Sequence, residues 1–293
     1  MKITFYGVRG STPTPGPSTV KYGGNTSCVL VELSNCQRVI FDAGTGLRIL
    51  GKQLVHEHGD INIILSHGHW DHIQGYPFFL PIYQPDRQIN VFTSNESGHK
   101  LLCSLFDQMD GYNFPLKAED LPSNSECIFR SAETVLFEKD IRMQKKSLNH
   151  PGGGSAYRIE DDGVSCAYIT DNELDPPYKV HTTYDEWVEF CSGVDILIHD
   201  AQYTEEDMPH KHGWGHSLIS QVRQLAVDAE VGTLVMFHHD PDRTDTQLDE
   251  IRVENEKYFK ERYDNNKSYC AAEGMVITLS KPVTGGKVRI EVE

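Results

Sequence analysis

Five apolar, strand-like segments of this chain each lead into an aspartate or a histidine. Strands that are buried on both faces have continuous apolar sequences. Where such strands are parallel, their carboxyl ends lie along one edge of the sheet. Ligands bind at that edge in many layered folds. The pattern therefore restricts the chain to a sheet-based fold with a polar site at one edge. The residues that end the five segments are Asp42, His67, Asp171, His199 and His238.

The order of apolar and amphipathic segments predicts an α/β fold, with mixed β-sheets covered by helices. The strands that we expect are Ile3–Tyr6, Ser27–Glu32, Arg38–Phe41, Ile61–Leu65, Ile89–Phe92, Ala156–Ile159, Ser165–Ile169, Ile196–Ile198, Thr233–Phe237 and Met275–Leu279. The helices that we expect are Gly46–Glu57, Gly98–Met109, Tyr184–Ser192, Ser217–Ala229 and Thr244–Tyr263, with Ser217 as the cap of the fourth.

The length of the chain, 293 residues, fits one large domain or two small ones. We take residues 1–293 as a single domain. Residues 76–125 differ from their surroundings because they are rich in proline and aromatic residues. This segment is either an ordinary connection with one helix or an insertion that forms a lid or a dimer surface beside the site.

The segment SHGHWDH, which directly follows an expected strand, places four potential metal ligands within six residues. His67 and His69 alternate, so an extended backbone can direct both toward one metal ion. Asp71 and His72 are adjacent and would diverge toward a second ion as the chain turns. Imidazole and carboxylate ligands suit zinc, manganese or iron better than calcium or magnesium. The alternative is a surface loop that happens to be rich in histidine.

The segment HGHWDH resembles the HxHxDH signature of the metallo-β-lactamase-fold hydrolases. This resemblance implies an αββα sandwich, in which two mixed β-sheets are flanked by helices. Asp42 in FDAGTG is similar to a structural aspartate of the family. The resemblance also implies that His67, His69 and His150 hold one metal ion. Asp71, His72 and His238 would then hold a second ion, with Asp171 bridging the two; His238 is preferred over the neighbouring His239.

Within this superfamily, the order HDAQY, GHS and LVMFHHDP resembles the branch of ribonuclease Z and the cyclic nucleotide phosphodiesterases. In that branch a histidine of the GHS type acts near the leaving group, and His216 is its match here. The alternative role of His216 is simply to begin a helix. His199 and Asp200 are expected to orient other groups. The opening loop resembles that of small cyclic nucleotide phosphodiesterases, so Arg9, Ser11 and Thr12 are candidate phosphate contacts.

These features together predict a hydrolase with two divalent metal ions, of which zinc is favoured over manganese or iron. The expected reaction converts a cyclic nucleotide to a nucleoside monophosphate, with Asp71 and His216 as catalytic residues. One alternative is a ribonuclease Z-like RNA endonuclease, and another is a lactonase or a related carbonyl hydrolase. A binding module that has kept only the fold is a further alternative, but such proteins usually lose metal ligands.

The formal net charge of −16 repels polyanions, so we expect a small phosphodiester substrate rather than long nucleic acid. The seven cysteines are scattered without a CxxC pair, which is typical of a reducing compartment. No apolar run approaches the length of a membrane span. We therefore expect a cytoplasmic protein without membrane contact, and the family resemblance implies a homodimer.

Overall fold

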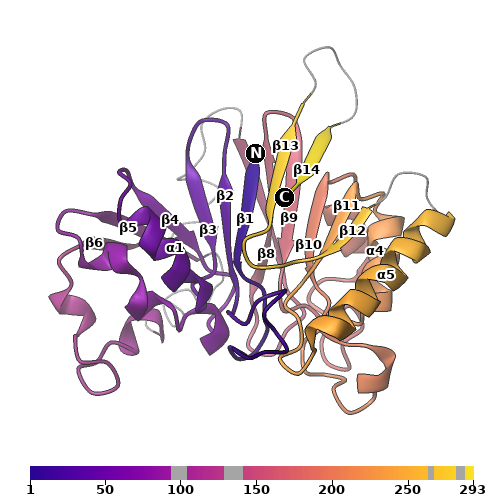
Figure 1. The fold of residues 1–293 in the computed structure, drawn as a ribbon, viewed down its shortest axis with the longest axis horizontal. Coiled ribbons are helices and arrows are strands. Elements are labelled where there is room, and N and C mark those ends of the chain that lie inside the picture. Colours follow the sequence, from indigo (N-terminus) through magenta and orange to yellow (C-terminus); the bar gives the residue numbers. More distant parts are fainter. Residues whose placement is uncertain (94–103, 129–140, 263–266, 282–287) are drawn as a thin grey trace.

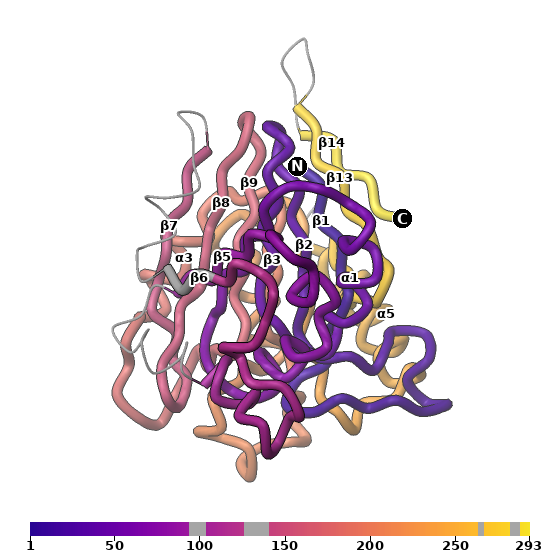
Figure 2. The backbone as a smooth tube through the Cα atoms, turned by 90° about the vertical axis from the view of Figure 1, so that its left-hand side faces the viewer, coloured from indigo at the N-terminus to yellow at the C-terminus, as the bar shows by residue number. Residues whose placement is uncertain are grey.

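Two mixed β-sheets lie face to face in the computed structural model of this protein, with helices on their outer sides (Figure 1). The structure describes residues 1–93, 104–128, 141–262, 267–281 and 288–293. In Figure 2, β7, β8 and β9 form one layer and β1, β2, β3 and β13 form the other. The expected α/β class, with two mixed sheets flanked by helices, is confirmed.

The first sheet has eight strands, in the order β14-β13-β1-β2-β3-β4-β5-β6. Strands β3, β4, β5 and β6 run parallel to one another, whereas the pairs β14-β13, β13-β1, β1-β2 and β2-β3 are antiparallel. The strands are β1 (Lys2–Gly7), β2 (Cys28–Glu32), β3 (Arg38–Phe41), β4 (Ile61–Ile64), β5 (Gln88–Phe92), β6 (Asn124–Ile128), β13 (Val276–Ser280) and β14 (Arg289–Val292).

The second sheet has six strands, in the order β12-β11-β10-β9-β8-β7. Strands β9 to β12 run parallel to one another, and β7 and β8 are antiparallel. The strands are β7 (Ile141–Ser147), β8 (Ser155–Asp161), β9 (Val164–Ile169), β10 (Ile196–Asp200), β11 (Thr233–Phe237) and β12 (Lys267–Cys270).

Apolar side chains fill three layers of this sandwich. Phe5, Val29, Tyr168 and Phe237 belong to the core between the two sheets. Alternate residues of the same strands point outward, so Leu30 packs under α1 and Ala167 packs under α3, α4 and α5. The central strands are therefore buried on both faces, which explains their continuous apolar sequences. The helices are α1 (Gly46–Leu54), α3 (Tyr184–Cys191), α4 (Ile219–Asp228) and α5 (Asp245–Arg262).

The expected strands and helices lie within a few residues of the observed ones, but four strands were not expected. These are β6, β7, β12 and β14, which are short or have many polar residues and so lack a clear apolar run. The expected helix Gly98–Met109 begins outside the described residues. The proposed Ser217 cap is wrong, because α4 is capped at Leu218 and the Ser217 hydroxyl instead donates to the carbonyl of Asn172 at 2.6 Å.

Residues 76–125 include β5 and the start of β6, so part of this segment belongs to the first sheet. Three short 3-10 helices also lie in it: Tyr76–Phe78, Leu80–Tyr83 and Ala118–Asp120. Its role as a lid or a dimer surface stays a prediction. In the described part of the chain, no helix is both long and apolar enough to cross a membrane.

Candidate metal centre and active site

Seven side chains from four segments of the chain form two overlapping clusters, in which the potential ligand atoms lie within 4.8 Å of one another. The first cluster contains His67, His69, His150 and Asp171. The second contains Asp71, His72, Asp171 and His238. The structure therefore brings together every residue that the sequence indicated as a metal ligand, and Asp171 belongs to both clusters.

Parallel strands of both sheets place these residues at one edge of the sandwich. Asp42 and His67 follow the parallel pair β3 and β4, whereas Asp171 and His238 follow the parallel strands β9 and β11. Asp42, Asp171 and His238 have φ values of 61°, 48° and 57°. Non-glycine residues rarely adopt this left-handed backbone, and it is concentrated at functional sites. The strained residues turn the chain directly after each strand, at the edge where the clusters form.

The first cluster is arranged around three imidazole rings. His150 Nε2 lies 3.0 Å from His69 Nδ1 and 3.7 Å from Asp171 Oδ2. His67 Nε2 lies 3.6 Å from the same carboxylate oxygen. The second ring nitrogen of His150 donates to the carbonyl of Gly215 at 2.9 Å, which leaves Nε2 as an acceptor toward the cluster.

The second cluster lies on the other oxygen of Asp171. His72 Nε2 is 3.0 Å from Asp171 Oδ1 and 3.1 Å from Asp71 Oδ2. His238 Nε2 is 3.2 Å and 3.1 Å from the same two oxygens. His239 points elsewhere, because its Nε2 donates to the carbonyl of Ala271. The choice of His238 over His239 therefore agrees with the geometry.

The donor atoms fit divalent cations. The Nε2 atom of His67 is buried and has no hydrogen-bond partner among the described residues. Such atoms cost free energy unless a partner such as a metal ion satisfies them. Burial lowers the pKa of His67 well below its ordinary value and that of His150 to about 4, so both rings are neutral, as metal ligation requires.

The two carboxylates of the clusters are ionised. Burial would raise the pKa of Asp171, but the facing rings of His238 and His72 hold that pKa well below its ordinary value. The same balance, with His72 as the main partner, lowers the pKa of Asp71. Two ionised carboxylates and five imidazoles with nitrogen and oxygen donors form a set that suits zinc, manganese or iron.

Asp42 lies behind the second cluster and is fully buried. One of its oxygens accepts the backbone N–H of Ser66 at 2.7 Å. The other accepts from His72 Nδ1 at 2.9 Å and from the hydroxyls of Ser66 and Tyr168. This contact fixes the ring of His72 with Nε2 toward the cluster, which is how carboxylates commonly orient metal-ligating histidines. The geometry agrees with the structural role that the family resemblance implies for Asp42.

Asp200 and His216 form a buried pair beside the second cluster. His216 Nδ1 lies 2.8 Å from Asp200 Oδ2, and the His216 ring stacks on His238 at 5.1 Å between centroids. Burial lowers the pKa of His216, but Asp200 outweighs this effect and raises that pKa to about 8. A protonated ring would carry its second proton on Nε2, the nitrogen that does not face Asp200. His199 is less involved, because its Nδ1 donates only to the carbonyl of Asp200.

The N-terminal loop does not present Arg9 to the site, although Arg9 was expected to contact the phosphate of the substrate. Arg9 is completely buried, and its guanidinium donates to the carbonyls of Gly23, Asp240 and Arg243. Arg9 therefore holds the loop in place, and this placement contradicts a direct contact with substrate phosphate. Ser11 donates its backbone N–H to Asp71 Oδ2 at 2.8 Å. Thr12 is exposed, and a substrate contact by it stays a prediction.

Glu173 is a site residue that the sequence analysis missed. Its carboxylate is buried and accepts the backbone N–H groups of Gly213 and Gly215 at 2.7 and 2.9 Å. Glu173 thereby holds the loop that leads into His216. Its position two residues after Asp171 is the only signal in the sequence, and acidic residues are too common for that signal to be specific.

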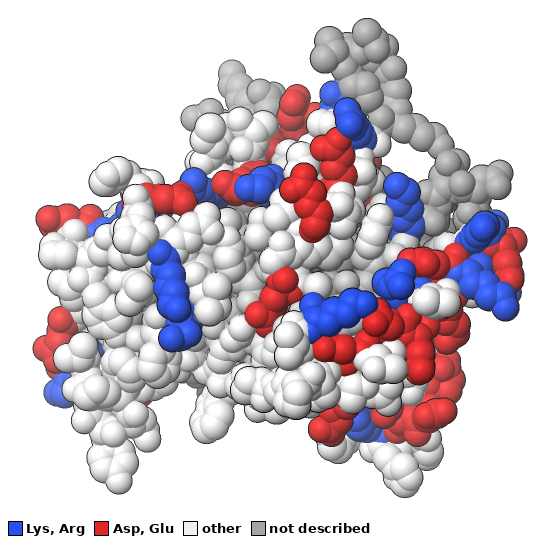
Figure 3. Space-filling view, viewed as in Figure 1, with Lys and Arg blue, Asp and Glu red and all other residues white. Residues whose placement is uncertain are grey.

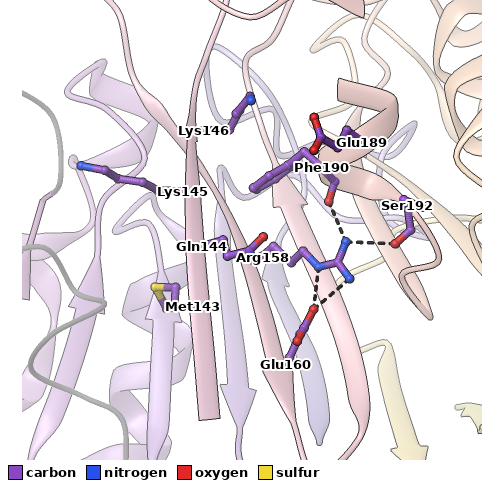
Figure 4. Close-up of a pocket in the computed structure, with 9 residues that line it drawn as sticks. All are labelled: Met143, Gln144, Lys145, Lys146, Arg158, Glu160, Glu189, Phe190 and Ser192. Carbon is purple, nitrogen blue, oxygen red and sulfur yellow. Dashed lines mark hydrogen bonds and ion pairs between the residues drawn. The ribbon is translucent and has the colours of Figure 1, made fainter. Parts of the chain in front are cut away.

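Two hollows in the surface of the described residues differ in their relation to the site. One of about 230 Å³ is lined by Glu173, His212 and His216, directly beside the metal clusters. The larger one, of about 650 Å³, lies between β7, β8 and α3 (Figure 4). There Arg158 is bound by Glu160 and by the carbonyls of Phe190 and Ser192. His216, whose ring stacks on the cluster residue His238, lines the smaller hollow, whereas neither His216 nor any cluster residue lines the larger one; the chemistry therefore belongs beside the smaller hollow.

Comparison with known proteins gives the same family as the site geometry. Residues 37–239 match the Beta-lactamase superfamily domain. Ribonuclease Z of Nocardia farcinica is 34% identical over 255 residues, which cover 75% of this chain and 83% of that protein. Ribonuclease Z of Thermoplasma acidophilum is 25% identical, over 90% of this chain and 94% of that protein.

Among solved structures, the metallo-β-lactamase fold protein YhfI from Bacillus subtilis aligns with a TM-score of 0.66 and 19% identity, over 94% of this chain and 98% of YhfI. At this identity the likeness concerns the fold alone. The domain match covers more than half of the chain, and the clustered histidines and aspartates are of the metal-binding kind. The chain therefore belongs to the beta-lactamase superfamily and is a hydrolase of the metallo-β-lactamase fold.

Proposed function

We propose that this protein is a two-metal phosphodiesterase that hydrolyses a cyclic nucleotide to a nucleoside monophosphate. The observation that supports this proposal most is the Asp200–His216 pair, which lies against the second cluster with a pKa of His216 raised to about 8. A protonated imidazole suits a leaving group that departs as an alkoxide, such as a ribose oxygen. The relatives named ribonuclease Z also favour a phosphodiester as the reacting group.

In this proposal His67, His69 and His150 would hold one ion, and Asp71, His72 and His238 would hold the other. Asp171 serves both, because its two oxygens face different clusters. Zinc is the favoured metal, and manganese and iron have compatible ligand preferences. Two bound divalent ions would lower the pKa of water and stabilise negative charge on the phosphoryl oxygens.

The residues of the chain supply the proton transfers. Asp71 is ionised and accepts the proton of the attacking water, whose oxygen forms a bond to phosphorus. The bond between phosphorus and the ribose oxygen breaks, and His216 Nε2 donates the proton that this oxygen needs. Asp200 keeps the His216 ring in place through Nδ1. Proton donation of this kind typically contributes about 10²–10⁴-fold to the rate.

RNA cleavage is the second candidate, because the relatives are called ribonuclease Z. The charge of the chain opposes it: 43 acidic residues face 27 basic ones, whereas phosphate-backbone binding requires clustered Lys and Arg. On the face shown in Figure 3, basic side chains are interspersed with acidic ones, and acidic side chains gather at the lower right, on the side of α4 and α5. A small substrate therefore agrees better with the charge.

The test is hydrolysis by the zinc- or manganese-loaded protein of a panel of substrates. The panel contains bis(p-nitrophenyl) phosphate, 3′,5′- and 2′,3′-cyclic nucleotides, a precursor transfer RNA, a lactone and a β-lactam. The Asp71→Ala variant is the control for metal dependence. We expect cleavage of the cyclic nucleotides by the natural sequence only. Cleavage of the transfer RNA alone would show that the substrate is RNA. Activity only on the lactone or the β-lactam would refute the phosphodiesterase proposal.

A further inference from the structure

Two tryptophans beside the metal clusters are largely exposed. The exposed fraction is 81% for Trp70 and 61% for Trp214, whereas Trp187, the third tryptophan of the chain, is completely buried. Indole rings contribute large apolar areas and are usually buried for most of that area. The exposure of both tryptophans next to the candidate active site therefore indicates a functional role.

Trp70 is held on a rigid part of the backbone. It lies between the cluster residues His69 and Asp71 and begins a short 3-10 helix. Its carbonyl accepts the N–H groups of Ile73 and Gln74 at 3.0 and 2.8 Å. The neighbouring side chains belong to the first and the second cluster respectively. The backbone that carries the Trp70 ring is thus fixed relative to both clusters.

Trp214 is also presented by a fixed backbone. Gly213 and Gly215, on either side, have φ values of +87° and +91°, which only glycine adopts without strain. Both N–H groups are bound by Glu173, a carboxylate that is 2% exposed. A buried charge with two short hydrogen bonds to one loop defines the path of that loop. The exposure of Trp214 is therefore built into a well-determined turn.

One imidazole connects the two tryptophan-bearing segments. His150 Nδ1 donates to the carbonyl of Gly215, next to Trp214. His150 Nε2 lies 3.0 Å from the ring of His69, next to Trp70. Both tryptophans are therefore one residue away from groups in direct contact with His150. The backbones of the two tryptophans therefore border the same centre, on segments that are far apart in the sequence.

We infer that Trp70 and Trp214 form the stacking surface for the flat ring of the substrate, a nucleobase, while its phosphate lies at the metal clusters. This inference rests on the proposed phosphodiesterase function and adds the means by which the base is recognised. Stacking on an indole accepts any base, because every base has a π-face. Glu173 acts as a positioning residue, since it fixes the turn that presents Trp214.

The first test compares two substrates in the Trp70→Ala and Trp214→Ala variants. One substrate is a 3′,5′-cyclic nucleotide, and the other is the same cyclic phosphate with a methoxy group in place of the base. Each variant should raise KM for the nucleotide by about 5- to 100-fold, the range expected for a lost stacking contact. For the substrate without a base, KM and kcat should stay unchanged. Val253→Ala, which removes an exposed apolar side chain of α5, is the matched control.

The second test uses fluorescence and does not require turnover. Titration with a nucleoside 5′-monophosphate should quench the tryptophan emission, whereas ribose 5-phosphate should not. The quenched fraction should decrease in Trp70→Phe and again in Trp214→Phe, because Trp187 is buried beyond reach of a ligand.

The possible outcomes separate this inference from the proposed function. If neither cyclic phosphate is hydrolysed and the monophosphate causes no quenching, the phosphodiesterase proposal fails. If the nucleotide is hydrolysed but its KM is the same in the tryptophan variants, or both substrates lose activity equally, the stacking surface is refuted and the phosphodiesterase stands.

Discussion

Individual residues of the site are placed by strained backbone and by buried hydrogen bonds. Asp42, Asp171 and His238 all have left-handed φ values at the ends of strands. Each is a non-glycine residue whose side chain belongs to the clusters or supports them. Strain of this kind costs about 1–3 kcal/mol per residue and persists only where surrounding contacts compensate it. At this scale, two substitutions test the assigned roles.

Replacing His216 tests proton donation to the leaving group. His216→Ala should lower kcat on a cyclic nucleotide by about 10²–10⁴-fold, because the ring that donates the proton is gone. Metal content, measured by inductively coupled plasma mass spectrometry, should equal that of the natural sequence. A variant that loses metal along with activity would show instead that His216 supports the metal centre.

Replacing Asp42 tests the support of His72. Asp42→Asn should weaken metal affinity by about 10- to 100-fold, since the carboxylate that orients the ring is lost. Competition with a chromogenic chelator measures this affinity. Asp161→Asn is the matched control, because Asp161 is also fully buried but binds Ser34 away from the clusters. Equal affinity losses in the two variants would argue against a specific role of Asp42.

At the scale of elements, loops after the strands determine what surrounds the metal centre. The segment from β10 to α4 contains a short 3-10 helix, Glu205–Asp207, and ends in the Gly215–Ser217 turn. Asp207 anchors this helix, because it accepts the N–H of Thr204 at 2.8 Å and a guanidinium N–H of Arg243 at 2.7 Å. The loop that carries His216 is therefore tied to the segment between β11 and α5.

The anchor at Asp207 should make stability depend on pH. Burial raises the pKa of Asp207, but Thr204 and Arg243 outweigh it and hold that pKa below its ordinary value. A lowered pKa stabilises the fold fully above about pH 4 and less as the pH falls through the folded-state value. Asp207→Asn should therefore lower the free energy of unfolding at pH 7 by about 1 kcal/mol or less, because solvent screens a partly exposed carboxylate. Urea unfolding should show this difference shrinking below pH 4; a constant difference would contradict the role.

Residues 76–125 form the element for which a homodimer contact is predicted. Phe78 and Tyr112 expose 54% and 93% of their surface there. We expect sedimentation equilibrium to show a dimer, and Tyr112→Asp to shift it toward monomer, since a charge opposes burial in an apolar contact. If the protein with the natural sequence is a monomer at all concentrations tested, the predicted homodimer is refuted.

The candidate metal centre joins both sheets, so ions bound there would stabilise the whole molecule. Seven metal-capable side chains meet at one edge of the sandwich, and the buried rings leave nitrogen atoms unsatisfied. Ions that bind only the folded state stabilise it by mass action, about 2.7 kcal/mol per site at 100 times Kd. We therefore expect the stability of the whole chain to depend on whether the site is occupied.

Chelation should consequently lower the melting temperature. For a chain of this size, removal of one such ion should reduce Tm by roughly 5–10 °C. Differential scanning calorimetry with and without a chelator measures the change, and zinc should restore it. Asp171→Ala, which lacks the shared carboxylate, should respond much less. If neither the chelator nor added zinc changes Tm, the clusters hold no stabilising metal.

The sequence alone determined the parts of this protein that are local in the chain. Apolar runs predicted the central strands, because strands buried on both faces have no polar alternation to confuse the pattern. SHGHWDH and the strand-end residues Asp171 and His238 indicated six of the seven candidate ligands, since the chemistry of a metal site requires particular side chains at short spacing. The seventh, His150, was implied only by the family resemblance. The four edge strands, β6, β7, β12 and β14, were not predicted, because strands at the borders of these sheets lack a continuous apolar sequence.

Only the tertiary structure decided which polar residues meet. The structural role of Arg9 could not be predicted from the sequence, because the carbonyls that accept its hydrogen bonds belong to Gly23, Asp240 and Arg243. Ser217 has the sequence of a helix cap, yet its hydroxyl binds Asn172 instead. Glu173 acquires its role from a loop 40 residues later. Contacts over such separations depend on how two sheets pack and on which carbonyls lose access to water, and neither property is a local property of the chain.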